Sequence, residues 1–497
     1  MKKELVKYLM MIFLGSAVFF NSCSSSSDFE EDNETGDENI DEKDDQDQFV
    51  TTGFSLELGK SQKETAVQIL STKDEIYVVG HTEADYGEVS DFEDFKGGYY
   101  DLYVTKLNAL GEIQWEKCFG TSLSEKAVEA HLAENGDLLI LGNTSQISYG
   151  NGGLGHLVGS SDIMVWRINS EGEIVWQLEP ANNNEDELIQ SGIVVDKSLV
   201  IFYTEIYGKG IHCLKIDLTS GTILEKTKLE YDYYSVYINK VKRTEDGGFV
   251  LVGSANNNAA IIKLNASFQK EWACDHGGSG GENGYDIAET ADGYLLVGST
   301  SSSQLALGNN NLYPYYRIIH DPVTKGTEVY LLKVDKSGQF KCNSWTSGNG
   351  NNVKNVGWQI GFGYLESEWC QEYTGLVRQP DSGIFLQKLA DDDYFILGTG
   401  TRHSNGEEVV GAGANGIPEK GLLAMNVNPN YEMKDNKKDD VYITWEKEFY
   451  SNVIQSKHYF DISEGIVDVF EAENVYLFLG EKDDNLYMSV LTKNELK

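Results

Sequence analysis

Basic residues are scarce in this chain of 497 residues. Lys and Arg together number 40 against 79 Asp and Glu, so the formal net charge at pH 7 is -39. A surface of that sign repels phosphate backbones, which argues against nucleic acid as a partner. The acidity favours solubility and cationic partners instead.

Cysteine is also rare, with six residues in the whole chain. Five of them follow Cys23, and an odd number leaves at least one thiol outside any disulfide. Four of the five fall on expected strands, where a buried thiol packs as a small hydrophobe: Cys118, Cys213, Cys274 and Cys342. The pair that we consider for a disulfide is Cys342 with Cys370.

The motifs of several enzyme classes are missing. The chain has no strong zinc-ligand spacing, no Gly-x-Ser-x-Gly nucleophile elbow, no phosphate-cradling Gly loop and no sialidase Asp-box. Asp391–Asp393 is typical of a solvated turn, and Gly277–Gly284 of a flexible link. Acids are so abundant that no carboxylate pair can be assigned to glycoside chemistry. We expect no catalytic residue, no metal and no cofactor.

The longest apolar run lies at the N-terminus. A basic start is followed by apolar residues from Tyr8 to Phe20, a stretch too short to span a membrane as a mature helix. We expect residues 1–22 to be a signal peptide. The residues Asn21-Ser22-Cys23 resemble a bacterial lipobox, with Phe20 where many lipoboxes carry Leu. This resemblance implies a diacylated Cys23 at the mature N-terminus; the alternative is an ordinary secretory signal beside an unrelated cysteine.

Residues 23–49 form an acidic tether. Between Ser24 and Gln48 there are twelve acids and one base, Lys43, so this stretch can bury almost nothing and is expected to be disordered. A Ser-rich, acidic stretch after the lipidated cysteine resembles the surface-export signal of Bacteroidetes lipoproteins. That resemblance implies an outer-membrane lipoprotein at the cell surface, held to the membrane through its N-terminal lipid only.

A unit of about fifty to seventy residues recurs seven times between Gly53 and Lys497. Its clearest feature is a short apolar run ending in Gly, as in Leu138–Gly142 and Phe249–Gly253, which is typical of a buried strand that then turns sharply. The first strands of the units are expected near Thr65, Ala127, Leu188, Tyr237, Tyr285, Ile384 and Gly465. Units of four strands that must stack on their neighbours indicate propeller blades. We predict an all-β fold in residues 50–497, a single propeller of seven four-stranded blades, with six or eight blades as alternatives.

The two ends of the repeat region complement each other. The last unit stops without a fourth strand, and an orphan strand, Gly53–Gly59, precedes the first unit. We predict that Phe54 to Leu58 completes the seventh blade and closes the ring, which removes an open sheet edge.

Five units carry a Trp in the expected fourth strand: Trp115, Trp176, Trp272, Trp345 and Trp445. A large ring at the same place in successive blades is most simply a packing wedge, because it buries much area.

The copies resemble β-propeller repeats of secreted Bacteroidetes proteins, most closely at Thr244–Phe249 and Thr290–Tyr294. The resemblance implies the fold and says little about activity. Segments such as Ile216–Leu224 also resemble the docking repeat of quinoprotein dehydrogenases. That repeat occurs in non-catalytic outer-membrane assembly lipoproteins too, and no cofactor constellation accompanies it here.

Long connections gather on one face of such a ring, because second-to-third and fourth-to-first connections leave from the same strand ends. They are expected at Glu83–Tyr100, Gln146–Ser160, Ser301–Glu328, Gly348–Gly383 and Arg402–Lys420. Long loops on a rigid scaffold usually build the recognition surface. The first of them ends in Tyr99 and Tyr100.

Aromatic rings beside hydrogen-bond donors suit sugar or peptide faces. The candidate ligand-binding residues on these connections are Trp358, Tyr364, Trp369, Tyr315, Tyr316, Arg317, Arg402 and His403. The alternative is that the rings only pack the loops into a cap.

We predict a surface-anchored lipoprotein whose propeller binds a glycan, peptide or protein partner through the elaborated face, without catalysis. One alternative is a glycan lyase or hydrolase with its site at the channel mouth. Another is a structural subunit of an outer-membrane complex. The ligand and the oligomeric state stay open.

Overall fold

The computed structural model describes a large part of the C-terminal nine-tenths of the chain. The described residues are 55–59, 63–83, 99–148, 156–178, 187–205, 210–229, 236–278, 280–302, 304–305, 316–317, 328–339, 358–362, 382–389, 393–403, 418–429, 454–461, 465–472, 475–482 and 485–493. The chain divides into two units, Met1–Gln48 and Phe49–Lys497, and all described residues belong to the second. Cys23, Cys342 and Cys370 lie outside the described residues.

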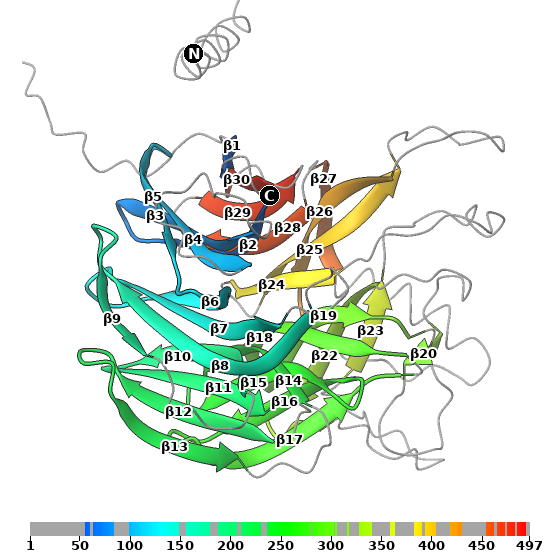
Figure 1. Ribbon diagram of the computed structural model, residues 1–497. Coiled ribbons are helices and arrows are strands. Elements are labelled where there is room, and N and C mark those ends of the chain that lie inside the picture. Colours follow the sequence, from blue (N-terminus) through cyan, green and yellow to red (C-terminus); the bar gives the residue numbers. More distant parts are fainter. Residues whose placement is uncertain are drawn as a thin grey trace, which may run out of the picture. The chain divides into compact units, whose positions relative to one another are not determined.

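The described elements are all β-strands, and they form seven four-stranded antiparallel sheets, the blades of a propeller (Figure 1). Blade 1 contains β2 (Lys63–Ser71), β3 (Glu75–Glu83), β4 (Tyr100–Asn108) and β5 (Ile113–Phe119). Blade 2 contains β6 (Ser124–Leu132), β7 (Leu138–Ser148), β8 (His156–Ile168) and β9 (Ile174–Leu178). Blade 3 contains β10 (Glu187–Val195), β11 (Ser198–Glu205), β12 (Ile211–Asp217) and β13 (Ile223–Leu229). Blades 4 and 5 contain β14 (Val236–Arg243), β15 (Phe249–Ala255), β16 (Asn258–Leu264), β17 (Lys270–His276); and β18 (Glu282–Thr290), β19 (Gly293–Thr300), β22 (Glu328–Asp335), β23 (Trp358–Phe362). Blades 6 and 7 contain β24 (Ser382–Lys388), β25 (Tyr394–His403), β26 (Pro418–Val427), β27 (Ile454–Asp461); and β28 (Gly465–Glu471), β29 (Val475–Lys482), β30 (Asn485–Thr492), β1 (Ser55–Leu58).

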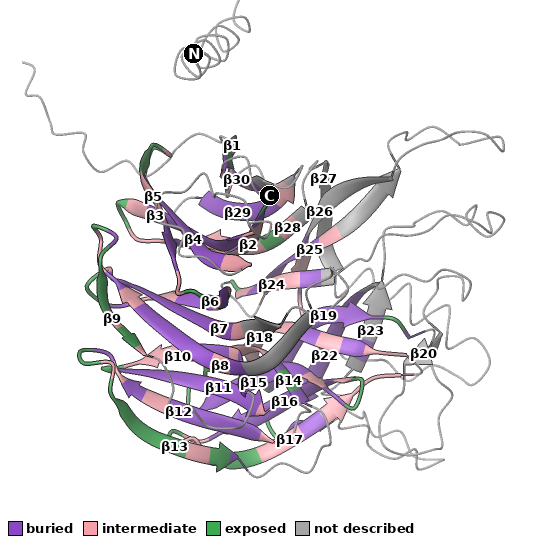
Figure 2. Ribbon diagram, in the orientation of Figure 1, coloured by how far each residue is buried: buried purple, intermediate pink, exposed green. Residues whose placement is uncertain are grey.

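These sheets confirm the predicted all-β propeller of seven blades, and each expected first strand is present. A small extra sheet pairs β20 (Gln304–Leu305) with β21 (Tyr316–Arg317) inside the connection between β19 and β22. Burial follows strand order within a blade: β3 and β19 are almost wholly buried, whereas the outer strand β13 is largely exposed (Figure 2). The middle strands are therefore covered on both faces by neighbouring blades.

The Gly at the end of each apolar run has a different cause from the one expected. Strand β15 continues past Gly253 to Ala255, so the chain does not turn there. Instead, the facing strand β14 has a bulge between Ile238 and Lys240. A Cβ atom on Gly253 would lie 1.8 Å from the carbonyl oxygen of Tyr237, so only glycine fits against the bulged strand.

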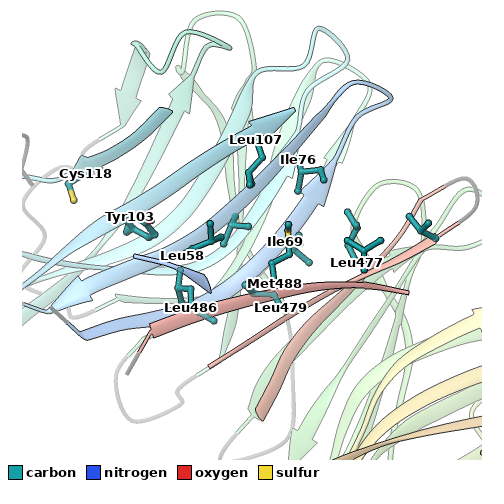
Figure 3. Close-up of a cluster of buried hydrophobic side chains, with 14 residues drawn as sticks. Leu58, Ile69, Ile76, Tyr103, Leu107, Cys118, Leu477, Leu479, Leu486 and Met488 are labelled. Carbon is teal, nitrogen blue, oxygen red and sulfur yellow. The ribbon is translucent and has the colours of Figure 1, made fainter. Parts of the chain in front are cut away.

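The ring closes as predicted, with β1 pairing antiparallel to β30. Leu58 lies opposite Leu486 and is only 2% exposed. It packs in an apolar cluster with Ile69 of blade 1 and Met488 of blade 7 (Figure 3). The N-terminal strand thus joins the last blade to the first; Phe54 lies outside the described residues.

Tryptophan and basic side chains tie successive blades together. The indole N–H of Trp115 and the ammonium of Lys106 both donate to the backbone carbonyl of Ser170 in blade 2, each at 3.0 Å. Trp176 and Arg167 repeat the arrangement on the carbonyl of Leu218 in blade 3. These contacts confirm the predicted wedge role for Trp115 and Trp176.

Trp272 of blade 4 also packs against the next blade. A Cβ atom on Gly338 of blade 5 would lie 2.6 Å from its ring. The expected strands for Trp345 and Trp445 are wrong. The fourth strands of blades 5 and 6 are β23 and β27, and both Trp residues lie outside the described residues. In blade 5 the wedge register position, opposite the third-strand Lys333, belongs to Trp358.

Replacing Leu58 by Ala should weaken the closure. Removing a fully buried leucine side chain from the shared cluster costs about 2–4 kcal/mol of unfolding free energy. The neighbouring substitution Glu57→Ala, at an exposed position of the same strand, should change it by less than about 0.5 kcal/mol. Urea unfolding of both variants measures the difference, and equal effects would contradict a closing role for β1.

Candidate functional site

The two faces of the propeller differ in their connections. On one, which we call the turn face, first-to-second and third-to-fourth strands are joined. These connections are short turns in blades 1 to 4, whereas the third-to-fourth connections of blades 5 and 6, from Asp335 to Trp358 and from Val427 to Ile454, are long. In blade 1 the side-chain carbonyl of Asn108 accepts the backbone N–H groups of Leu110 and Glu112 at 3.0 and 2.9 Å. Asn169, Asn265 and Asp335 cap the matching turns of three other blades. These turns are tight and internally satisfied, which leaves little for a ligand.

The opposite face, the loop face, carries the second-to-third and fourth-to-first connections. The connections from Glu83 to Tyr100, Thr300 to Glu328 and His403 to Pro418 all leave from it. Because antiparallel strands alternate in direction, the ends of these hairpins lie on one side of the ring. Large parts of the connections lie outside the described residues.

The predicted ligand-binding residues fall in three places. Tyr316 and Arg317 form β21, opposite Leu305 and Gln304. Arg402 and His403 extend β25, opposite Glu419 and Pro418 of β26, so they belong to a longer hairpin and not to an open loop. Tyr315, Tyr364 and Trp369 lie outside the described residues.

Trp358 lies elsewhere in the fold than the sequence predicted. We expected it in the loop-face connection Gly348–Gly383, but it begins the outer strand β23 opposite Lys333. That expected connection is therefore wrong, because residues 348–357 precede the fourth strand of blade 5 and belong to its third-to-fourth connection. Trp115 begins the outer part of blade 1 opposite Lys106 in the same way. Trp358 is therefore at the turn-face end of its blade.

An aromatic cluster occupies the described part of the loop face, between blades 1 and 2. The rings of Tyr99 and Tyr100 meet edge to face with centroids 4.6 Å apart, and His81 meets Tyr100 in the same manner at 5.3 Å. The ammonium of Lys126 lies 3.8 Å from the centroid of the Tyr100 ring. The hydroxyl of Tyr99 donates to Glu83. The two tyrosines are half-buried, so part of each ring faces solvent.

The ionisation of this loop-face cluster follows from its burial. Burial lowers the pKa of His81 to about 4, with the nearby Lys126 adding to the effect, so the imidazole is neutral at pH 7. Burial also lowers the pKa of Lys126, while Glu83 opposes that shift. The cluster thus places aromatic rings and an imidazole that is neutral at pH 7 beside the side chains of Lys126 and Glu83. The sequence pointed to Tyr99 and Tyr100 as aromatic residues of a long connection. It did not point to His81 and Lys126, because they are ordinary residues of the strands β3 and β6.

A second group of residues, polar in every blade except blade 6, surrounds the propeller axis. In each first strand the residue after the bulge takes an equivalent place: Gln68, Glu129, Ser191, Lys240, Asp286, Phe385 and Asp468. Four of these side chains accept a backbone N–H from the next blade: Gln68 from Ala130, Glu129 from Gly192, Asp286 from Leu386 and Asp468 from Ile69, at 2.6 to 3.0 Å. The axial ring is therefore an inter-blade lock.

Lys240 is the axial cation, because its ammonium lies 3.8 Å from Glu129 and also faces Asp286 and Asp468. Burial disfavours its charge, but these three carboxylates prevail and raise the pKa of Lys240.

The axial carboxyls respond differently to burial. Burial opposes ionisation of Glu129, but His131 and Lys240 outweigh it and lower the pKa of that carboxyl to about 2. For Asp468 burial dominates and raises the pKa to about 6. Perturbed pKa values often mark functional sites. Here each carboxyl has an inter-blade partner, so we assign the axial ring to stability.

The described residues offer no other chemical centre of the kinds sought. Within them, no group of three His, Cys, Asp or Glu side chains could hold a metal ion. No helix in this described part is long and apolar enough to cross a membrane. Cys118, Cys213 and Cys274 are buried on strands, as expected, and burial raises the pKa of Cys213 to about 12.

Comparison with known proteins finds distant structural likenesses and no match in sequence. No protein-family model matches the chain. No curated protein sequence matches it. Hydrazine synthase of Kuenenia stuttgartiensis is similar in structure with a TM-score of 0.43 and 9% identity, over 82% of this chain and 99% of that one. The Nup133 β-propeller of Vanderwaltozyma polyspora (0.37, 10% identity, 85% and 99%) and the WD40 domain of SCAP from fission yeast (0.36, 8% identity, 90% and 99%) are similar too. At these scores the likenesses say nothing about function.

Asp468 should make stability depend on pH. Because its folded pKa is raised, the stability it contributes is complete below the unfolded value of about 4 and is lost as the pH rises through about 6. Asp468→Asn keeps an acceptor for Ile69 without a charge. The melting temperature of this variant relative to the wild type should rise between pH 4 and 7. The exposed substitution Asp74→Asn is the control, and parallel curves for all three proteins would contradict the assignment.

Proposed function

We propose that this protein is a bacterial surface lipoprotein whose propeller binds an extracellular glycan or peptide through the loop face. The observation that carries the proposal is the contrast between the two faces. In blades 1 to 4 the turn face consists of tight turns, with caps such as Asn108 and Asn169. The loop face bears the long connections together with the half-buried rings of Tyr99 and Tyr100.

The chemistry of the loop-face cluster favours a ligand with both apolar and hydroxyl or amide surface. Tyrosine rings supply contact area at a low entropy cost, and the phenol, ammonium and carboxylate beside them orient polar groups. Tyr316, Arg317, Arg402 and His403 lie on hairpins of blades 5 and 6 that end at the same face, and they extend the proposed surface beyond blades 1 and 2.

Attachment to the outer membrane is a separate part of the proposal. It is supported by the lipobox-like residues before Cys23, by the acidic stretch of residues 24–48, and by the resemblance of the repeats to those of secreted Bacteroidetes proteins.

Ligand binding should depend on Tyr99 and Lys126. Replacing either by Ala should weaken the binding of the mature protein about tenfold, in line with the loss of an interface anchor. Binding is measured on panels of immobilised polysaccharides and of peptides, whichever gives a signal. Leu110→Ala, at a residue 69% exposed on the turn face, is the matched control and should leave affinity unchanged. A weaker signal for the control than for Tyr99→Ala would contradict ligand binding through the loop face. Formation of a product from a polysaccharide or peptide of the panel would indicate an enzyme instead.

Lipidation should depend on Cys23. Cells given labelled palmitate should incorporate it into the wild-type protein and not into Cys23→Ser, because the thiol is the attachment atom. Externally added protease should then remove the wild-type propeller from intact cells. Label in the Cys23→Ser protein would contradict the lipid anchor, and protection from protease would contradict surface exposure.

A further inference from the structure

A buried glutamate recurs where the chain passes from one blade to the next. The sequence Gly-x-Ser-x-x-Glu occurs at residues 59–64, 120–125 and 277–282, and the glutamate is the first or second residue of the first strand in blades 1, 2 and 5. The side chains of Glu64, Glu125 and Glu282 are at most 2% exposed. We did not predict these residues, because the repeat was not visible among so many acids.

In blade 2 this glutamate meets a second carboxyl group. One oxygen of Glu125 accepts hydrogen bonds from the hydroxyls of Thr121 and Thr144, at 2.5 and 3.2 Å. The other faces the carboxyl of Asp101 on the third strand of blade 1, and both side chains are fully buried. A Cβ atom on Gly120 would lie 2.4 Å from Asp101 Oδ1 and 2.9 Å from Glu125 Oε2, so glycine is required for the two carboxyls to approach.

Two carboxylate oxygens are both acceptors, so they can bond to each other only through a proton. Burial disfavours the charged form and raises the pKa of Glu125, although the threonine hydroxyls and Asp101 act against the shift. At the matching position before blade 5, Asn258 lies near Gly277, where blade 2 has Asp101 near Gly120. There Glu282 accepts from Thr300, Ser302 and the backbone N–H of Gly278. That glutamate is held entirely by ordinary donors.

Within the described residues, the charges that act most strongly on Glu125 do not replace the proton. Thr82, opposite Asp101 in the sheet, donates to the buried Glu64. His81 on β3 is neutral near pH 7. On the other side Asp162 of β8 lies opposite Thr144. Lys126 places its ammonium over Tyr100, with Glu83 near it, and none of the larger influences on the pKa of Glu125 is a base.

The carboxyl pair lies directly beneath the loop-face cluster. Tyr100 precedes Asp101 on β4, and its backbone N–H donates to the hydroxyl of Ser124 at 3.0 Å. Ser124 and Lys126 flank Glu125 on β6. Any change in the distance between the two carboxyls therefore moves Tyr100 against Lys126.

We propose that Asp101 and Glu125 share one proton at neutral pH and clamp blade 1 to blade 2 beneath Tyr100 and Lys126. Alkaline solution removes this proton to solvent base, leaves two adjacent buried carboxylates, and loosens the 120–124 link. The clamp would also regulate ligand binding by Tyr100 and Lys126, and this part of the inference rests on the proposed function. The shared proton and the clamp themselves are tested without a ligand.

Melting temperatures between pH 6 and 9.5 test the clamp. Because the folded pair holds its proton more tightly than the unfolded chain, its contribution is present at low pH and lost as pH rises. Glu125→Gln supplies a permanent N–H donor to Asp101, and Asp101→Asn supplies one to Glu125. Relative to either variant, the wild type should lose about 2 °C or more across this range. Glu282→Gln is the matched control and should follow the wild-type slope.

Two local measurements keep the clamp testable if a variant does not fold. In the wild-type protein, hydrogen exchange of the 120–126 segment, corrected for intrinsic rates, should accelerate at high pH. The infrared difference between pH 8 and pH 10, a range above the pKa of about 6 of Asp468, should show the loss of a protonated carboxyl band. Parallel melting curves, or no such band, would overturn the shared proton. If the wild-type protein shows the carboxyl band but binds nothing on the polysaccharide and peptide panels, only the proposed function is contradicted.

Discussion

Each blade of this propeller has two apolar faces that only neighbouring blades can cover, and the ring depends on that constraint. The apolar clusters cross the boundaries between blades, as when Phe202 and Ile211 of blade 3 pack with Phe249 and Leu251 of blade 4. Polar contacts reinforce the same boundaries at two radii. Trp and Lys or Arg side chains donate to the next turn near the rim, and axial side chains accept from the next first strand near the centre. Sliding one blade past the next would break both sets at once.

This arrangement separates stability from recognition. In blades 1 to 4 the described inter-blade ties occupy the axis and the turn face, and the longer connections leave from the loop face. The axial charges have partners within the ring of blades: Lys240 and His131 act on Glu129, Lys242 lies 2.6 Å from Asp286, and the backbone N–H of Ile69 donates to Asp468. The loop-face cluster is different, because the rings of Tyr99 and Tyr100 are half exposed although aromatic area of that size is costly to leave in water.

The sequence predicted the architecture because each blade repeats the same local pattern. The runs Leu138–Gly142 and Phe249–Gly253 mark buried second strands, and the missing fourth strand of the last unit predicted its pairing with residues near Leu58. The fourth strands of blades 5 and 6 were misplaced because Trp345 and Trp445 matched the pattern in composition, while only strand pairing shows that Trp358 holds the register position. The site was harder still. His81 and Lys126 are ordinary strand residues whose meeting with Tyr100 depends on the packing of two blades, which no local pattern encodes.

The strand pairing that closes the ring also sets the order of events during synthesis. β1 is made long before its partner β30, so it stays without that partner until β30 has been synthesised. Until then the first blade lacks the apolar cover that includes Met488, and the seventh blade has an open edge that other chains can pair with. Closure is thus a late event in synthesis, since Leu58 cannot be buried before β30 exists.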